Sequence, residues 1–246
     1  MINDTNSGSP FKQWKKGFKL AKGDLIWIAE SDDSCKLDFL ETLVNEFEKE
    51  DNCILAFCAS EIISGSGQII SETHPYNSSM LISGKQFINK YLSRYNYISN
   101  ASSALFAKKV LINIDDNYTQ FRGCGDWIFW TEIAKNGNVA YIDIPLNRFR
   151  QHGRNTTNQQ TNSVRGAYEI IKVTKFLRKK HYIDYFYYFR AKIVNVYSIR
   201  YGKSRFLFTR EQIDEIQKEW GWDFFSSFTI KILFYANKAG IKLIKR

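Results

Sequence analysis

The stretch LAKGDLIWIAESDDSC, residues 20–35, decides the fold class of this chain. Residues 25–29 form a short, continuous apolar run with an acidic cluster directly behind it, which is typical of a buried strand in a parallel sheet. Before the run, apolar residues recur at intervals of three and four, so a helix is expected over 11–22, ended by Gly23. In open α/β sheets, ligands bind at the carboxyl end of such a strand.

Predicted strands and helices alternate from this stretch up to about residue 145. Further strands are expected at 53–59, 103–106 and 139–142, and further helices at 37–50, 83–92 and 126–135. Pro145 is expected to end the last strand. From residue 164 onward the pattern is helical and basic, with amphipathic helices at 210–220 and 224–243. We therefore predict an α/β domain with a mostly parallel sheet over residues 1–158 and a helical C-terminal extension over 159–246.

The composition favours a cytoplasmic globular protein. Hydrophobic residues make up 44% of the 246 residues, which is enough for a core. The N-terminus is polar and resembles no signal peptide, and no apolar run reaches the roughly 18 residues of a membrane-spanning helix. The four cysteines form no C-x-x-C pair, and with three histidines they give no zinc spacing. Free thiols fit a reducing cytoplasm.

The net charge of +10 is unevenly distributed. Residues 147–246 carry 21 Lys and Arg against 7 Asp and Glu, whereas residues 1–146 carry 14 against 18. A basic half beside a slightly acidic half indicates an anionic partner, for which membrane lipid, nucleotide phosphate and nucleic acid are candidates. The alternative is a solvated helical surface without a partner.

The acidic cluster itself predicts a metal site. Glu30, Asp32 and Asp33 follow a buried strand, and carboxylates so close together repel each other when ionised. A bound Mg²⁺ or Mn²⁺ removes this penalty and uses one or two protein carboxylates, with substrate phosphates completing its shell. The alternative is a helix N-terminus, in which Asp33 or Ser34 caps the following helix.

Two segments of the chain resemble inverting glycosyltransferase family 2. The first is NSGSPFKQWKKGFKLAKGDLIWIAESDD, residues 6–33, which is similar to the family's Asn-x-Gly turn, helix, strand and D-x-D-type motif. The second is GDWIFWTEIAKNGNVAYIDIPLNRFRQHGRN, residues 125–155, in which an acidic residue and Trp open a helix and Arg-x-His follows a strand. The resemblance covers residues 3–158 and implies a GT-A-like fold.

The sequence departs from the family pattern in two ways. Family members usually begin with several further strands that build most of the nucleotide pocket, and this chain starts after them, so the expected GT-A-like domain is N-terminally incomplete. The D-x-D position begins with Glu30 instead of Asp. We interpret this as a variation, because a Glu carboxylate still binds the ribose or metal-bound water.

The resemblance assigns roles to the acidic residues. It implies that Asp32 and Asp33 bind the metal and that Glu30 contacts the ribose or the metal's waters. Asp126 is implied as the general base, at a helix N-terminus that favours its ionised form. The alternative for Asp126 is a helix cap.

The remaining implied roles concern the acceptor and the donor diphosphate. Trp127 is a candidate acceptor platform, whereas Trp130 is expected in the core. Arg150 and His152 follow a strand and are implied to hold the donor diphosphate, together with the nearby Arg148.

The resemblance implies a bacterial enzyme of cell-surface polysaccharide synthesis. It would transfer a sugar from a nucleotide-sugar donor to a glycan or lipid-linked acceptor, with inversion and with Mn²⁺ or Mg²⁺. The alternative is a catalytically incomplete glycosyltransferase-like protein that binds partners or acts as a scaffold.

The C-terminal extension contains an aromatic run at 182–189 and a basic, apolar segment at 224–246. A basic amphipathic helix with aromatic anchors is typical of contact with an anionic membrane surface. We therefore expect a peripheral position at the inner face of the cytoplasmic membrane. The alternative is that these apolar faces pack on the catalytic domain. No nucleic-acid-binding motif is present, and nucleic acid is not expected as a partner.

Overall fold

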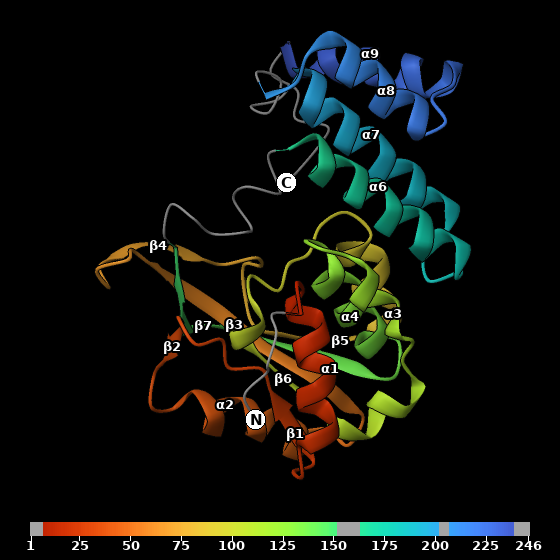
Figure 1. Cartoon of the computed structure of the whole chain (residues 1–246). Helices are drawn as coiled ribbons and strands as arrows, with labels where there is room; N and C mark the ends of the chain where they lie inside the picture. The colour runs from red at the N-terminus through yellow and green to blue at the C-terminus, as the bar shows by residue number, and fades with distance from the viewer. Residues whose placement is uncertain (1–6, 152–162, 202–206, 239–246) are drawn as a thin grey trace. The chain divides into compact units, whose positions relative to one another are not determined.

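The computed structural model describes residues 7–151, 163–201 and 207–238. The chain forms two compact units, residues 1–155 and 156–246 (Figure 1). The predicted domain boundary between residues 158 and 159 lies outside the described residues.

The N-terminal unit contains a mixed sheet with helices on both of its faces. Its strands are β1 (Leu25–Trp27), β2 (Ser34–Cys35), β3 (Cys53–Ile63), β4 (Ile69–Thr73), β5 (Met80–Ser83), β6 (Ala104–Ala107) and β7 (Asn138–Arg150). Its helices are α1 (Pro10–Leu20), α2 (Phe39–Lys49), α3 (Gly84–Phe87), which continues into the π-helical turn η1 (Ile88–Leu92), and α4 (Gly125–Ala134). Short 3-10 turns are η2 (Ala101–Ser103), η3 (Lys108–Asn113) and η4 (Asp116–Gln120).

The α/β class is confirmed, but the sheet is mixed and not mostly parallel. The order along the sheet is β1-β6-β3-β7-β2, with β4 paired to β3 and β5 paired to β7. Among the described strands, β3 and β7 are the one parallel pair. β6 lies antiparallel between β1 and β3, so these two strands share a direction without being neighbours. Apolar runs indicate burial on both faces, and they carry no information about the direction of the partner strand.

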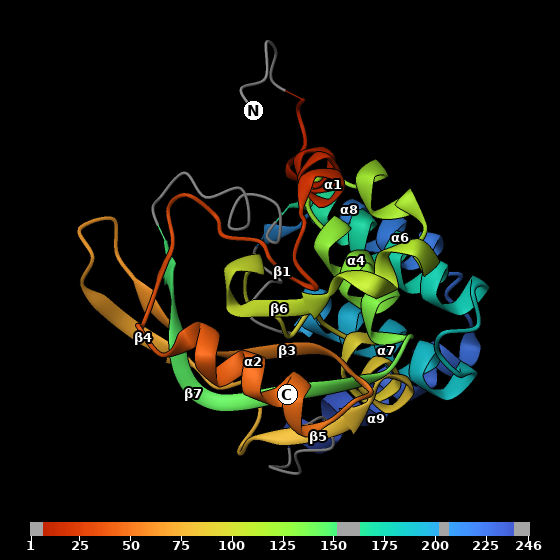
Figure 2. The same cartoon turned by 90° about the horizontal axis from the view of Figure 1, so that it is seen from below.

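The long strand β3 is the centre of the core and is buried at every position. On one face its side chains pack against α2, where Phe39 and Leu43 are fully buried beside Ala56 and Cys58 (Figure 2). On the other face Phe57 contacts the aromatic rings of α3 and β7. The carboxyl ends of β1, β3 and β7 therefore point toward the same edge of the sheet.

Strand β7 continues past the predicted stop at Pro145. The pairing of β3 with β7 shifts register around Ala59, which is opposite Pro145. Proline is tolerated at such an irregularity because no ladder hydrogen bond is required of its nitrogen. The continuation carries Arg148 and Arg150 to the edge where the acidic turn lies.

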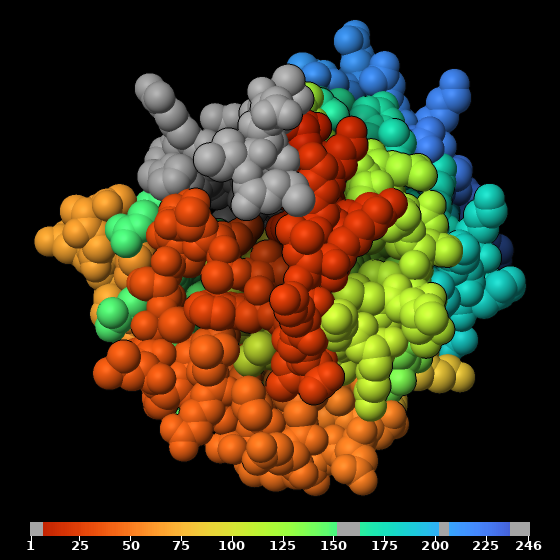
Figure 3. Space-filling model, turned by 60° about the horizontal axis from the view of Figure 1, so that its bottom comes forward, coloured from red at the N-terminus to blue at the C-terminus, as the bar shows by residue number. Residues whose placement is uncertain are grey.

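Helix α1 packs on α4 through the predicted apolar face. The rings of Trp14 and Phe18 lie 5.6 Å and 5.3 Å from Phe129. At Gly125 a β-carbon would lie only 2.5 Å from the ring of Phe11, so glycine permits this close approach. Figure 3 shows α1 in red on the surface of this unit, beside the yellow-green segment that leads into α4. The contact fixes the start of α4, where Asp126 lies.

The C-terminal unit consists of helices in its described residues. They are α6 (Val164–Lys179), α7 (Tyr185–Tyr201), α8 (Arg210–Glu219) and α9 (Phe224–Lys238). Their shared core includes Ile171, Val196 and Trp220. In the described part of the chain, no helix has both the length and the apolar character that a membrane crossing requires.

Candidate functional site

The turn that follows β1 is fixed to the segment that precedes β6. The indole nitrogen of Trp27 donates to the carbonyl of Ser102 over 2.9 Å, and the backbone nitrogen of Glu30 donates to the Ser102 hydroxyl over 3.0 Å. β1 and β6 are antiparallel, so the end of one strand lies beside the start of the other. The predicted acidic cluster is therefore held at the carboxyl edge of the sheet.

Asp33 binds two other segments through three hydrogen bonds to its carboxylate. Its Oδ2 accepts hydrogen bonds from Asn100 Nδ2 at 2.5 Å and Ser102 Oγ at 2.7 Å, and its Oδ1 accepts from the backbone nitrogen of Arg150 at 2.9 Å. Burial raises the pKa of Asp33 above its ordinary value, although these donors act in the opposite direction. Asp33 thus fixes the relative positions of β1, η2 and β7.

A buried polar network continues below Asp33. The side-chain amide of Asn147 donates to Ser60 Oγ and to Asn100 Oδ1, both at 2.9 Å. Ser60 and Asn147 are fully buried, and Asn100 is nearly so. These hydrogen bonds connect β3 and β7 to Asn100, which in turn donates to Asp33.

The pKa of Glu30 depends on its burial and on the carboxylates around it. Burial, followed by the charges of Asp33, Asp32 and Asp126, raises its pKa to about 7. Asp126 is about a hundred positions away in the sequence, yet its charge acts on Glu30. The charge of Asp126 therefore reaches the turn that carries Glu30, Asp32 and Asp33.

Asp126 is the second residue of α4 and is half-buried. Its Oδ2 accepts a hydrogen bond from Asn96 Nδ2, and its Oδ1 accepts one from the backbone nitrogen of Trp127, both at 2.8 Å. These donors and the positive end of the helix dipole stabilise the ionised carboxylate. An ionised, oriented carboxylate is the form that accepts a proton from a hydroxyl group.

Trp127 does not fit its predicted role. Its side chain is 3% exposed, and its indole nitrogen donates to the carbonyl of Leu92 over 2.6 Å. A ring buried in this way offers no face to an acceptor sugar, so we do not retain Trp127 as a platform. Trp130 is fully buried, as predicted for the core.

The arginines predicted for the diphosphate contact other parts of the protein. Arg150 Nε donates to the carbonyl of Asp32 over 2.8 Å, and its Nη1 donates to the carbonyls of Ser64 and Gly65 over 3.0 Å and 3.1 Å. Arg150 thereby connects the acidic turn to the β3–β4 turn. Arg148 pairs with the buried carboxylate of Glu61 at 2.9 Å. His152 lies outside the described residues.

Comparison with known proteins finds one family model. Residues 2–114 match the family model described as Glycosyl transferase family 2. The predicted resemblance to glycosyltransferase family 2 is confirmed over these residues. No curated protein gives a significant sequence match.

Three similar solved structures are of TarS from S. aureus. TarS 1–349 in complex with UDP-GlcNAc has 11% sequence identity and a TM-score of 0.49, and the alignment covers 89% of this chain and 53% of that one. TarS 1–349 alone has 11% identity and a TM-score of 0.46, with 89% and 52% covered. The third TarS structure has 10% identity and a TM-score of 0.45, with 89% and 31% covered. The chain spans about half the length of the first two.

The carboxylates at this edge of the sheet fit a hard divalent cation only if a substrate supplies further ligands. Carboxylate oxygens are the ligands that Mg²⁺ and Mn²⁺ prefer. Within the described residues, however, no group of three or more His, Cys, Asp or Glu side chains forms a ready metal site. Asp32 and Asp33 fit a cation that arrives with a diphosphate and takes its remaining ligands from phosphate oxygens and water.

Sequence reasoning missed the polar residues that orient the acids of this site. Each of Asn96, Asn100, Ser102 and Asn147 makes a hydrogen bond to a side chain 30 to 87 positions away in the sequence. Only the run of polar residues directly before the apolar strand at 104–107 gives a local signal. Asn96 gives none.

Proposed function

We propose that this chain transfers a sugar from a nucleotide-sugar donor to a glycan or lipid-linked acceptor, with inversion at the anomeric carbon. We also propose a role in bacterial cell-surface polysaccharide synthesis. The observation that carries the proposal is the position of Glu30, Asp32 and Asp33 on one turn at the carboxyl edge of the sheet, where Asn100, Ser102 and the backbone of Arg150 hold Asp33. Asp126 lies near enough for its charge to add to the rise that burial mainly causes in the pKa of Glu30. The match to family 2 supports the same reaction class.

On the donor side, Asp32 and Asp33 are the residues that would hold Mn²⁺ or Mg²⁺. The cation, when bound, neutralises the negative charge that develops on the leaving diphosphate. The Asp32 side chain is exposed, whereas Asp33 is fixed by its three donors, so Asp33 orients the turn and Asp32 offers the more accessible oxygens. Glu30 lies beside them for the ribose or for metal-bound water.

Arg150 and His152 are proposed to contact the donor diphosphate. Arg150 already lies against the backbone of Asp32, so its guanidinium is next to the acidic turn. Guanidinium groups bind phosphate through a planar set of donors. His152 is placed in this group by the family resemblance.

On the acceptor side, Asp126 acts as the general base. It takes the proton of the acceptor hydroxyl while the hydroxyl oxygen bonds to the anomeric carbon. The bond between that carbon and the diphosphate oxygen breaks in the same step, and its electron pair leaves with the diphosphate. One displacement of this kind inverts the anomeric carbon.

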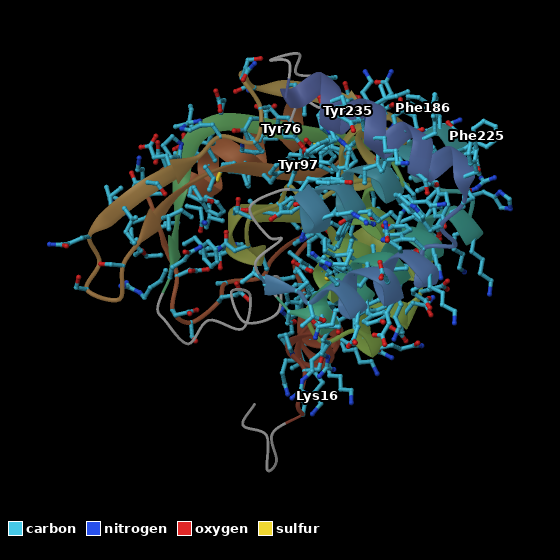
Figure 4. All side chains as sticks on the ribbon, turned by 90° about the horizontal axis from the view of Figure 1, so that it is seen from above. Lys16, Tyr76, Tyr97, Phe186, Phe225 and Tyr235 are labelled. Atoms are coloured by element: carbon cyan, nitrogen blue, oxygen red, sulfur yellow. The ribbon has the colours of Figure 1, made fainter. Side chains whose placement is uncertain are left out.

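We further propose that the C-terminal unit contacts an anionic membrane surface at the inner face of the cytoplasmic membrane. Helix α9 exposes one aromatic and aliphatic face, which consists of Phe224, Phe225, Phe228, Ile232 and Tyr235 (Figure 4). Lys231 is exposed on the same face, and Ile230 on the opposite side is buried in the unit's core. Apolar side chains with adjacent cations suit the interface of an anionic bilayer.

The reaction is tested by following nucleoside diphosphate release from a panel of UDP-sugars with Mn²⁺ and simple glycoside acceptors. Asp126→Asn should keep donor binding and lower kcat by on the order of a hundredfold or more, because the base is lost. Asp51→Asn removes an equal charge at an exposed turn and should change neither donor binding nor kcat. Release of no nucleoside diphosphate by the parent chain would favour the catalytically incomplete alternative.

A further inference from the structure

The segment between η1 and η2 lies against the general base. Asn96 donates to Asp126 through its side-chain nitrogen over 2.8 Å, and its side-chain oxygen accepts from the backbone nitrogen of Ile98 over 3.2 Å. Both ends of the Asn96 amide are therefore engaged. The residues on either side of Asn96 are thus held beside the Asp126 carboxylate.

Tyr95 is the more exposed of the two aromatic residues in this segment. Its side chain is 56% exposed, and its ring centroid lies 5.9 Å from that of Tyr97 and 6.5 Å from that of Trp127. Tyr97 in turn stacks on Tyr76 at 5.6 Å, and the two lie together in Figure 4. Tyr95 is therefore supported by packed rings while more than half of its surface remains open.

The connection between Tyr95 and the general base runs through its neighbours. Asn96, the next residue, donates to Asp126, and the Tyr95 ring lies 6.5 Å from that of Trp127, which follows Asp126. Isolated exposed aromatic residues are common on protein surfaces and need no explanation. What distinguishes Tyr95 is its position beside the carboxylate that is proposed to activate an acceptor hydroxyl.

We infer that Tyr95 contacts the acceptor, with its ring packed against the apolar face of the sugar whose hydroxyl Asp126 deprotonates. The inference rests on the proposed function and gives Tyr95 the role that the buried Trp127 does not fill. Aromatic rings suit this role because the C–H groups of a pyranose form an apolar face. Asn96 is then a positioning residue, which orients Asp126 toward the same sugar.

The test uses the full chain with Mn²⁺, a panel of UDP-sugars and p-nitrophenyl glycosides as acceptor probes. Tyr95→Ala should raise the KM for the glycoside roughly threefold to tenfold, which corresponds to the loss of one aromatic packing contact. The KM for the UDP-sugar, and the slow release of UDP to water without acceptor, should not change. Tyr95→Phe and Tyr95→Trp should restore acceptor KM. The matched control is Leu81→Ala, which truncates another exposed side chain, on β5.

Each other outcome has a definite meaning. An unchanged acceptor KM in Tyr95→Ala, or an equal loss in donor KM and in UDP release to water, overturns the assignment of Tyr95. Failure of Tyr95→Phe to restore acceptor KM overturns packing through the ring. If the parent chain releases no UDP from any donor, the proposed function itself fails, and the assignment of Tyr95 fails with it.

Discussion

Asp32 and Asp33 are neighbours in the chain, but their side chains have different surroundings. Asp33 accepts hydrogen bonds from Asn100, Ser102 and the backbone of Arg150, whereas the Asp32 side chain is exposed. Asn100 is 6% exposed and Ser102 is 1% exposed, so their donors have little access to water as a substitute for Asp33. The two acids should therefore differ in their contribution to stability even if both bind a metal.

Asp33→Ala should lower the free energy of unfolding by about 2 kcal/mol or more, because buried donors lose a charged acceptor. Asp32→Ala should lower it by less than about 0.5 kcal/mol, as is usual for an exposed position. Urea unfolding followed by tryptophan fluorescence measures the difference, since four of the six tryptophans lie in the N-terminal unit. Equal losses in the two variants would contradict the proposed division of roles.

The residues that the sequence predicted best are those whose signal is local. The acidic cluster directly follows an apolar run, and its grouping with Asp126 is consistent with the raised pKa of Glu30. Asn96 and Asn147 were not predicted, because each is defined by a partner far away in the chain. The sequence around an asparagine in a polar loop does not indicate which carboxylate or amide its side chain contacts.

At the scale of elements, α4 explains why Trp127 was misread. Every residue of α4 except Asp126 is buried, so the helix has no solvent face. The spacing of Trp127 and Trp130 therefore cannot separate a core residue from an exposed one. Strand β7 was also predicted too short, because Pro145 is accommodated by a register shift that depends on β3.

His74, just after β4, connects that strand to β7 and gives the fold a pH dependence. Its Nδ1 lies 2.8 Å from Asp143 and its Nε2 lies 2.9 Å from Glu72. Hydrogen bonds to Glu72 and Asp143 raise the pKa of His74, and the His74 and Tyr141 donors lower the pKa of Asp143. Protonated His74 stabilises the folded state. This stabilisation is complete below the pKa of histidine in the unfolded chain, 6.5, and it is lost as the pH rises through the raised pKa of His74 in the folded state.

The parent and His74→Ala should differ in Tm. This difference should be largest at about pH 5.5 and should shrink toward about pH 8.5. Thermal unfolding across this range measures it. The variant Asp143→Asn removes one of the two negative charges beside His74 and should reduce the same pH dependence. A difference in Tm that stays constant, or grows with pH, would show that His74 contributes by packing instead of charge.

At the scale of the whole molecule, the charge is concentrated in the C-terminal half, and the exposed face of α9 adds apolar area to it. Each cation near an anionic bilayer contributes on the order of 1 kcal/mol, screened over about 8 Å at physiological salt. The chain should therefore co-sediment with phosphatidylglycerol vesicles, bind phosphatidylcholine vesicles much less, and be released by salt.

Replacing both Phe225 and Phe228 by Ser should weaken this sedimentation. Ile112→Ser changes an equally exposed apolar residue of the N-terminal unit and should not affect it. Equal binding to both kinds of vesicle would indicate apolar insertion without charge recognition. Undiminished binding of the Phe225→Ser, Phe228→Ser variant would exclude the α9 face as the contact.

The central claim is that the grouped carboxylates form a donor site that depends on a divalent cation. Calorimetric titration of the whole chain with a panel of nucleotide-sugars, with and without Mn²⁺, tests it most directly. The parent should bind a nucleotide-sugar only when Mn²⁺ is present. Asp32→Asn should abolish this binding while the protein remains folded, whereas Asp51→Asn should bind like the parent. Donor binding by Asp32→Asn as tight as that of the parent, or binding independent of Mn²⁺, would contradict the claim.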